Sequence, residues 1–188
     1  MFANGFPQIN DEIVNRVVAI IPLKTYNNVN VRAAGNDIGY FLDPTPMSFP
    51  YRLYALDIED AVLLGLDYTE RTILHCVYTR SCDGYVREKH IKALLAEDFP
   101  GWAIPYIVKI CDEYVVEILQ TVYDNLKGKN TDNFKKFCAD NPETFFKSYC
   151  RMVSYWNIYY RHKVQFGNYV GHKLFTECFG YYDARYVL

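Results

Sequence analysis

Apolar and polar residues recur with a helical period over most of the chain. Asn10 is suited to cap a helix running to about Ile21, with Asp11 and Glu12 favourably placed at its positive end. Pro22 ends this helix because proline removes a backbone donor. The same period predicts further helices over residues 57–66, 69–80, 85–96, 100–127, 131–139, 142–164 and 169–179. The chain is therefore expected to be mainly α-helical.

One stretch near the N-terminus departs from the helical period. Within residues 26–42, Val29 and Val31 alternate with polar residues, and Gly35-Asn36-Asp37 follows as a turn sequence. This pattern predicts a small β-hairpin around that turn. Three prolines in residues 43–50 then predict an extended connector, because proline is excluded from helices and from central strands.

Composition indicates a folded chain without a membrane span or a metal site. Of the 188 residues, 51% are hydrophobic and 22% are charged, which is ordinary for a globular protein. No secretion signal or spanning apolar run is recognised, so a cytoplasmic setting is expected. Six scattered cysteines lack metal-ligand spacing, and neither a metal nor a cofactor is predicted. The expected domains are 1–50, an N-terminal appendage packed on the main part, and 51–188, the helical domain.

A short family resemblance lies in the middle of the chain. Asp83, then Val86-Arg87, then Ala93-Leu94 have the spacing found in the second helix of a HEAT-type repeat, which residues 69–95 resemble. The resemblance implies antiparallel helix pairs that stack, with Asp83 and Arg87 in a polar ladder between units. The expected fold is thus an antiparallel helical domain with HEAT-like pairs and a small N-terminal β-hairpin.

The same helix carries the first candidate site. On a helical wheel Arg87 and His90 fall on its broad apolar face, so both need partners inside the protein. Asp83, one turn away, and Asp112 from the following helix are the expected carboxylates. A structural ion pair is favoured for Arg87, with a ligand-anchoring guanidinium as the alternative. His90 is interpreted as a hydrogen-bonded core residue rather than a catalytic base.

No pattern in the chain specifies a catalytic reaction. Glu113 and Glu117 have a spacing that aligns two carboxylates, but both are expected on a solvated helix face. Nucleophile elbows and phosphate-binding glycine loops are not found. No catalytic residue is therefore predicted.

The second candidate site lies in the aromatic C-terminal part. The last 55 residues hold 16 of the 32 aromatic residues. Phe145, Tyr149, Met152, Trp156 and Tyr159 recur at three- and four-residue steps, so they are expected to pack as core. Basic residues on the other side, combined with aromatic ones, also suit anion binding. The candidate anion-binding residues are Arg151, Tyr155, Arg161, His162 and Lys163.

Charge is distributed unevenly and bears on function. Residues 1–126 carry 10 basic and 17 acidic side chains, a net −7, whereas residues 127–188 carry 10 and 5, a net +5. This asymmetry could steer an anionic ligand to the C-terminal end or pair two copies head to tail. The favoured function is a non-enzymatic protein-interaction or scaffold module that binds another protein or itself. The alternatives are an anionic-ligand or nucleic-acid-binding protein and, last, an enzyme built on Arg87 and His90.

Overall fold

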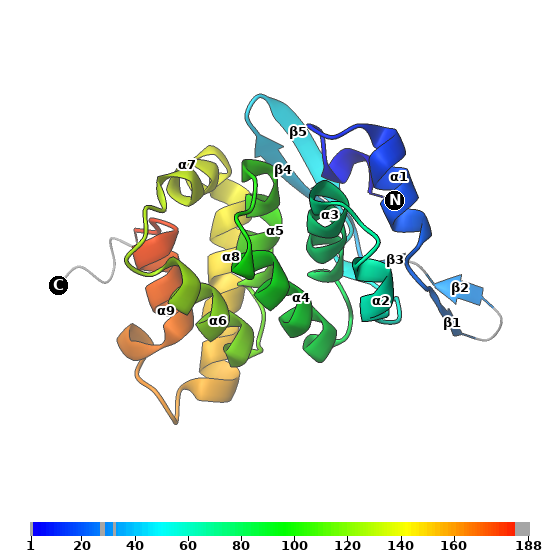
Figure 1. Ribbon diagram of the computed structural model, residues 1–188. Helices are drawn as coiled ribbons and strands as arrows, with labels where there is room; N and C mark the ends of the chain where they lie inside the picture. Colours follow the sequence, from blue (N-terminus) through cyan, green and yellow to red (C-terminus); the bar gives the residue numbers. More distant parts are fainter. Residues whose placement is uncertain (1, 27–28, 32, 183–188) are drawn as a thin grey trace. The chain divides into compact units, whose positions relative to one another are not determined.

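The computed structural model of the chain describes residues 2–26, 29–31 and 33–182 (Figure 1). The chain divides into two compact units, Met1–Tyr106 and Ile107–Leu188. Most of the described residues are helical, and the strands are confined to the N-terminal unit. The mainly α class with a small N-terminal hairpin is therefore confirmed. The domain boundary expected at residue 50 stays a prediction.

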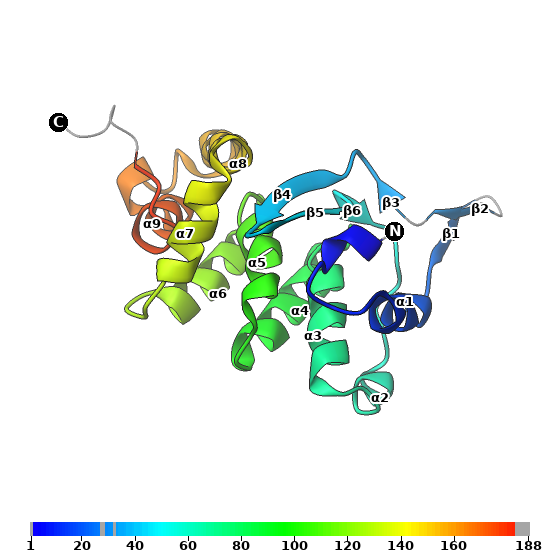
Figure 2. The same ribbon diagram turned by 90° about the horizontal axis from the view of Figure 1, so that it is seen from above.

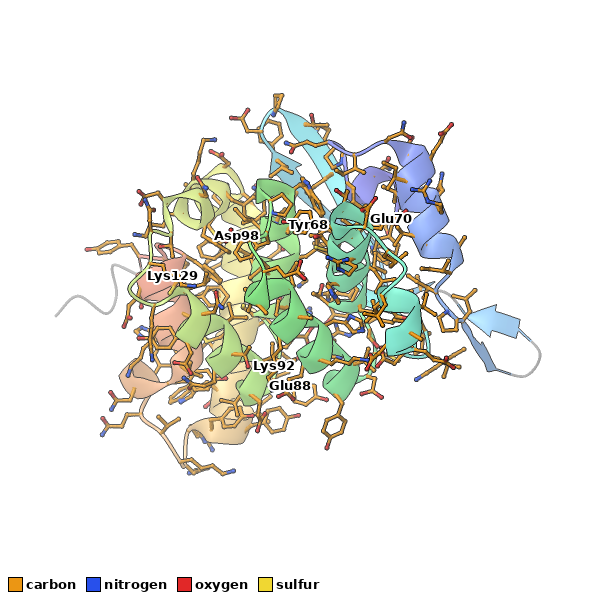
Figure 3. All side chains as sticks on the ribbon, viewed as in Figure 1. Tyr68, Glu70, Glu88, Lys92, Asp98 and Lys129 are labelled. Carbon is orange, nitrogen blue, oxygen red and sulfur yellow. The ribbon has the colours of Figure 1, made fainter. Side chains whose placement is uncertain are left out.

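Two helices of the first unit, α3 (Tyr68–Tyr78) and α4 (Gly84–Ala96), form an antiparallel pair. Helices α3 and α4 lie side by side in both views (Figures 1 and 2). The hydroxyl of Tyr68, the first residue of α3, donates a hydrogen bond to the carbonyl of Asp98, just beyond the end of α4 (Figure 3). The start of one helix is thereby tied to the end of the other. The helical segments of this unit are α1 (Asp11–Ala19), α2 (Asp60–Leu63), α3 (Tyr68–Tyr78), α4 (Gly84–Ala96) and the short 3₁₀ turns Ala3–Gly5 and Gly101–Ala103.

Side-chain caps explain where these helices begin. Asn10 caps α1 as predicted, because its side-chain oxygen accepts a hydrogen bond from the Glu12 backbone. The helix predicted over residues 69–80 begins one residue earlier, because Asp67 caps α3 and forms a reciprocal capping box with Glu70. The helix predicted over residues 57–66 is shorter than expected, because α2 begins only at Asp60 and ends at Leu63. Asp57 instead forms a hydrogen bond with His90.

The strands pair differently from the sequence prediction. β1 (Lys24–Tyr26) pairs with β2 (Val29–Val31), and β3 (Ala33–Ala34) pairs with β6 (Arg52–Leu53). β4 (Ile38–Leu42) pairs with β5 (Thr45–Phe49) across Asp43-Pro44. The hairpin expected around Gly35-Asn36-Asp37 was therefore wrong in its pairing, because β3 and β4 on either side of this turn pair with β6 and β5 instead of with each other.

The connector predicted from three prolines is in fact strand β5. Pro46 lies within β5 opposite Phe41 of β4. A two-stranded sheet has only edge strands, and an edge strand tolerates proline because its outer side needs no backbone donor. On the inner face of the hairpin, Phe49 stacks on Tyr106 with ring centroids 4.2 Å apart. Tyr106 also stacks on Phe6, so one buried tyrosine joins the hairpin to the N-terminal turn.

The second unit is helical throughout its described part. α7 packs on α8, while α6 packs on α9 and on the π-helical segment that follows it. Its helical segments are α5 (Ile104–Ile110, which starts at the end of the first unit), α6 (Val116–Leu126), α7 (Asp132–Asp140), α8 (Pro142–Tyr155), α9 (Val170–Lys173), the π-helical segments Trp156–Tyr160 and Leu174–Cys178, and the 3₁₀ turn Phe166–Asn168. None of the described helices is both long and apolar enough to cross a membrane.

The long helix expected over residues 100–127 was wrong. It is interrupted at residues 111–115, between α5 and α6. The interruption changes the direction in which the two glutamates point, since they no longer share one continuous helix. Glu117 is exposed as expected, but Glu113 is buried.

Aromatic packing joins α8 to the π-helical segment Leu174–Cys178. Phe145 stacks on Phe175 with centroids 5.4 Å apart, and Tyr149 meets Phe175 edge-on. Gly171 in α9 allows the two helices to approach. A Cβ atom at this position would lie 2.6 Å from the Tyr169 ring and 2.9 Å from the Met152 side chain.

Gly171 offers a direct test of this close approach. We expect Gly171→Ala to lower the free energy of unfolding by about 1–3 kcal/mol, because the added methyl group overpacks the contact. Gly167→Ala is the matched control, since a Cβ atom there has nothing within 4 Å. Urea denaturation of both variants checks the prediction, and equal stabilities would contradict it.

Candidate functional site

The C-terminal half of α8 and the segment after it form the first candidate site. Phe145, Tyr149 and Met152 are buried, as the aromatic period predicts. Further along the helix the prediction fails, because Tyr159 is 53% exposed and no residue of Trp156–Tyr160 is buried. The expectation that Tyr159 belongs to the core was therefore wrong.

A change in helix type accounts for this failure. After Tyr155 the helix becomes a π-helix, in which the Arg161 amide donates to the Trp156 carbonyl, five residues back. Such a turn holds more residues than an α-turn, so the side chains beyond it are rotated away from the buried stripe. Trp156 remains half-buried because its indole N–H donates to the Val164 carbonyl, 3.0 Å away.

Four tyrosines meet at this end of the helix, and we call them the tyrosine cluster: Tyr114, Tyr155, Tyr159 and Tyr160. Ring centroids are 5.8 Å apart for Tyr114 and Tyr155, and 5.9 Å apart for Tyr114 and Tyr159. The Tyr160 hydroxyl donates to the Tyr114 carbonyl at 2.7 Å, which fixes the residue-111–115 loop against the π-helix. Burial raises the pKa of Tyr160, so its hydroxyl stays a donor at neutral pH. The four rings therefore contact one another near the surface, and the Tyr160 hydroxyl ties the cluster to the loop.

The predicted anion-binding residues follow the cluster directly. Arg161, His162 and Lys163, here called the basic turn, are all exposed. Arg161 donates to the Asn157 side chain at 3.2 Å and to His162 Nε2 at 3.1 Å. The structure therefore brings Tyr155 to the cluster and the basic turn to the end of the same helix. Arg151 lies one turn before Tyr155 and is partly buried.

Residues of the first predicted network are divided between the units. Asp83 caps α4, accepting from the Tyr85 backbone amide at 2.9 Å. Arg87 is buried and donates to the Ser81 carbonyl at 2.7 Å. Asp112 belongs to the second unit, where it accepts hydrogen bonds from Lys109 and Ser148. The ion pair expected for Arg87 stays a prediction.

His90 takes part in a hydrogen-bond chain that sequence reasoning missed. Its Nε2 lies 2.9 Å from Asp57 Oδ1, and its Nδ1 lies 2.8 Å from His75 Nδ1. Lys89 Nζ also contacts Asp57, at 2.8 Å. The Tyr78 ring stacks on the His90 ring with centroids 4.3 Å apart. These hydrogen bonds connect the partly exposed carboxylate of Asp57 to the two buried imidazoles.

The hydrogen-bond geometry assigns the tautomers of His90 and His75. The Asp57 carboxylate can only accept, so His90 donates from Nε2 and accepts at Nδ1. His75 must then donate from its Nδ1. Burial lowers the pKa of His90 against the opposing effect of Asp57, and burial, together with His90, lowers the pKa of His75 to about 4. Both imidazoles are therefore neutral at pH 7.

Asp57 stays ionised because its hydrogen-bond partners lower its pKa by more than its partial burial raises it. Burial acts to raise its pKa, but hydrogen bonds from Lys89 and His90 together bring the pKa below its usual range. No sequence signal links Asp57 to a histidine 33 residues later. The burial of His90 on an apolar helix face indicated only that some partner was required.

Similarity to known proteins does not indicate a function for these residues. Comparisons with protein-family models, with curated proteins and with solved structures find no match. Within the part of the chain that the structure describes, no three metal-ligating side chains come together. The function must therefore be argued from the tyrosine cluster, the basic turn and the histidine pair themselves.

The histidine pair predicts a pH-dependent stability. Unfolded His75 has a pKa near 6.5 and the folded residue a pKa of about 4, so the unfolded state binds more protons between these values. The contribution of neutral His75 to the free energy of unfolding is fully present above pH 6.5. It falls by about 2–3 kcal/mol as the pH is lowered toward 4.

Urea denaturation of the wild type and of His75→Gln between pH 7 and pH 4 measures this effect. The variant should lose less stability between pH 7 and pH 4, because it lacks the imidazole whose pKa is lowered in the folded state. His162→Gln, an exposed histidine, should behave as the wild type does. Identical pH slopes for His75→Gln and the wild type would contradict the prediction.

Proposed function

We propose that the chain is a non-enzymatic protein-interaction module whose binding surface is the tyrosine cluster with its basic turn. The single observation that supports this most is the exposure of large side chains at the end of α8. Tyr114, Ile158 and Tyr159 are each about half exposed or more. Tyrosine and arginine are the residue types enriched among the energetically dominant contacts of protein interfaces.

Local charge indicates the chemistry of the partner. Residues 144–176 contain five Lys and Arg residues and no Asp or Glu. An acidic segment that also presents apolar side chains would complement both features, since its carboxylates face the basic turn and its apolar groups cover the rings. The proposed partner is therefore an acidic and apolar protein segment.

Binding of nucleic acid is the second candidate, favoured by the same acid-free stretch. The basic turn offers two permanent cations, Arg161 and Lys163. Neutralising so few phosphates yields a shallow salt dependence and weak affinity. The tyrosine rings also contact one another, so their faces are partly used within the cluster. A protein segment suits this surface better.

The alternative of an enzyme built on Arg87 and His90 gains no support from the geometry. The two side chains are 1% and 0% exposed, whereas a reacting group has to meet its substrate. Their hydrogen bonds join α4 to the Asp57 region and to Ser81, which is a structural role.

Two finer features belong to the same proposal. A reducing, cytoplasmic setting is supported by the six cysteines, all of which are free thiols. HEAT-like character is proposed for the α3–α4 pair alone, on its antiparallel packing and on the residues that resemble the repeat.

A defined acidic peptide tests the binding surface. We expect a dye-labelled peptide of alternating Glu and Leu to bind the full chain, measured by fluorescence anisotropy. Tyr159→Ser should weaken binding by about tenfold or more, because a central aromatic contact is removed. Tyr85→Ser is the matched control, since Tyr85 is 85% exposed but lies on α4, in the first unit. It should bind as the wild type does.

Two outcomes would contradict the proposal. One is equal binding by Tyr159→Ser and the wild type. The other is equal binding of a peptide in which lysine replaces glutamate. Salt-sensitive retention of the wild type on heparin that Tyr159→Ser loses would instead favour the nucleic-acid candidate.

A further inference from the structure

A second exposed apolar surface lies on the first unit. Leu64, which follows α2, is 88% exposed, and Leu56 and Val62 are also exposed. Leucines so open to water are unusual when they stand together in one short segment. We call residues 56–67 the acidic α2 segment.

The charge of this segment is opposite to that of the tyrosine cluster. Residues 56–67 contain four Asp and Glu residues and no Lys or Arg. Lys89 reaches the segment from α4 and pairs with Asp57 and Asp60 at 2.8 and 2.9 Å. Arg71 also reaches the segment, donating to the Leu66 carbonyl at 2.7 Å. These two cations do not balance the four carboxylates, and Asp60 remains 81% exposed. The segment is thus anionic and apolar at once.

The backbone of the segment is held in place at its start. The Leu56 amide donates to the Pro22 carbonyl at 2.8 Å, and the Leu56 carbonyl accepts from the Tyr78 hydroxyl at 2.8 Å. Asp57 is bound to His90. A segment that is already ordered loses little conformational entropy on binding.

We infer that the partner of the tyrosine cluster is the acidic α2 segment of a second copy of this chain. The inference rests on the proposed function and names its partner. Each surface carries exposed apolar side chains next to charges that are mainly of one sign. At the cluster these charges are basic except for Glu117 near Tyr160, and at the segment they are acidic. Two tyrosine clusters facing each other would place basic turns together, so the contact is between unlike surfaces.

A contact between unlike surfaces has a consequence for assembly. Each copy uses its cluster for one neighbour and its acidic segment for another, so association is head to tail and continues unless a ring closes. Both surfaces are small, so the association is expected to be weak and to depend on protein concentration. Added salt should weaken it further, because part of the attraction is between exposed charges.

Complementation between two variants tests this arrangement on the full chain. In sedimentation velocity at low salt, the wild type should show a mass that rises with concentration beyond the dimer, or to a closed ring. Leu64→Ser and Tyr159→Ser each remove one surface, and each alone should associate at least about tenfold more weakly. An equimolar mixture should form dimers that grow no further, because one variant keeps its cluster and the other keeps its acidic segment.

Controls separate the specific contact from loss of folding. Tyr85→Ser should associate as the wild type does, since it removes an exposed tyrosine outside both surfaces. Both surface variants should keep the wild-type midpoint in urea. A variant that is destabilised is replaced by Val62→Ser for the segment or Ile158→Ser for the cluster, both of which remove exposed side chains.

Three results would overturn the inference. They are a monomeric wild type up to several hundred micromolar, a mixture that fails to restore the dimer, and variants that associate as the wild type does. These results differ from a failure of the proposed function. A monomeric wild type that still binds the Glu-Leu peptide through Tyr159 would retain the binding surface and remove only the second copy as its partner.

Discussion

The contact of α8 with α9 and the π-helical segment Leu174–Cys178 is the interaction on which the second unit depends. Phe145 and Tyr149 pack against Phe175, and Gly171 permits the close approach of α9. These residues cover only the first part of the long helical segment that starts at Pro142. Beyond Tyr155 the segment continues as a π-helix without buried residues. The same aromatic-rich helix therefore serves as core at one end and as surface at the other.

Rigidity distinguishes this surface from a frayed helix end. The Trp156 indole is bonded to the Val164 carbonyl, and the Tyr160 hydroxyl to the Tyr114 carbonyl. Both hydrogen bonds use the polar tip of an aromatic side chain, so the rings are fixed while their apolar parts stay accessible. A preorganised surface of this kind pays little entropy when a partner covers it. Exposure combined with order is the reason to interpret the cluster as a binding surface.

Sequence patterns predicted the features that depend on neighbouring residues. Asn10 and the period of Phe145, Tyr149 and Met152 were correct because capping and helical amphipathicity act over one or two turns. The pairing of β4 with β5 was missed because two-stranded sheets lack the constraint that excludes proline from a central strand. Tyr159 was wrongly predicted to be buried because the π-helix changes the helical period, and no glycine or proline in the sequence marks this change. The partner of His90 was missed because contacts between distant segments leave no periodic signal.

The buried hydrogen-bond chain and the exposed acidic segment are parts of one arrangement. Asp57 belongs to both, since it accepts a hydrogen bond from His90 in the interior and is part of the segment that presents Leu64 to solvent. Tyr78 contributes twice as well, stacking on His90 and donating to the Leu56 carbonyl. An imidazole that is kept neutral by burial can donate to Asp57 without adding a positive charge, so the segment keeps its acidic character. The interior histidines therefore order the segment and preserve the charge that a basic partner surface would recognise.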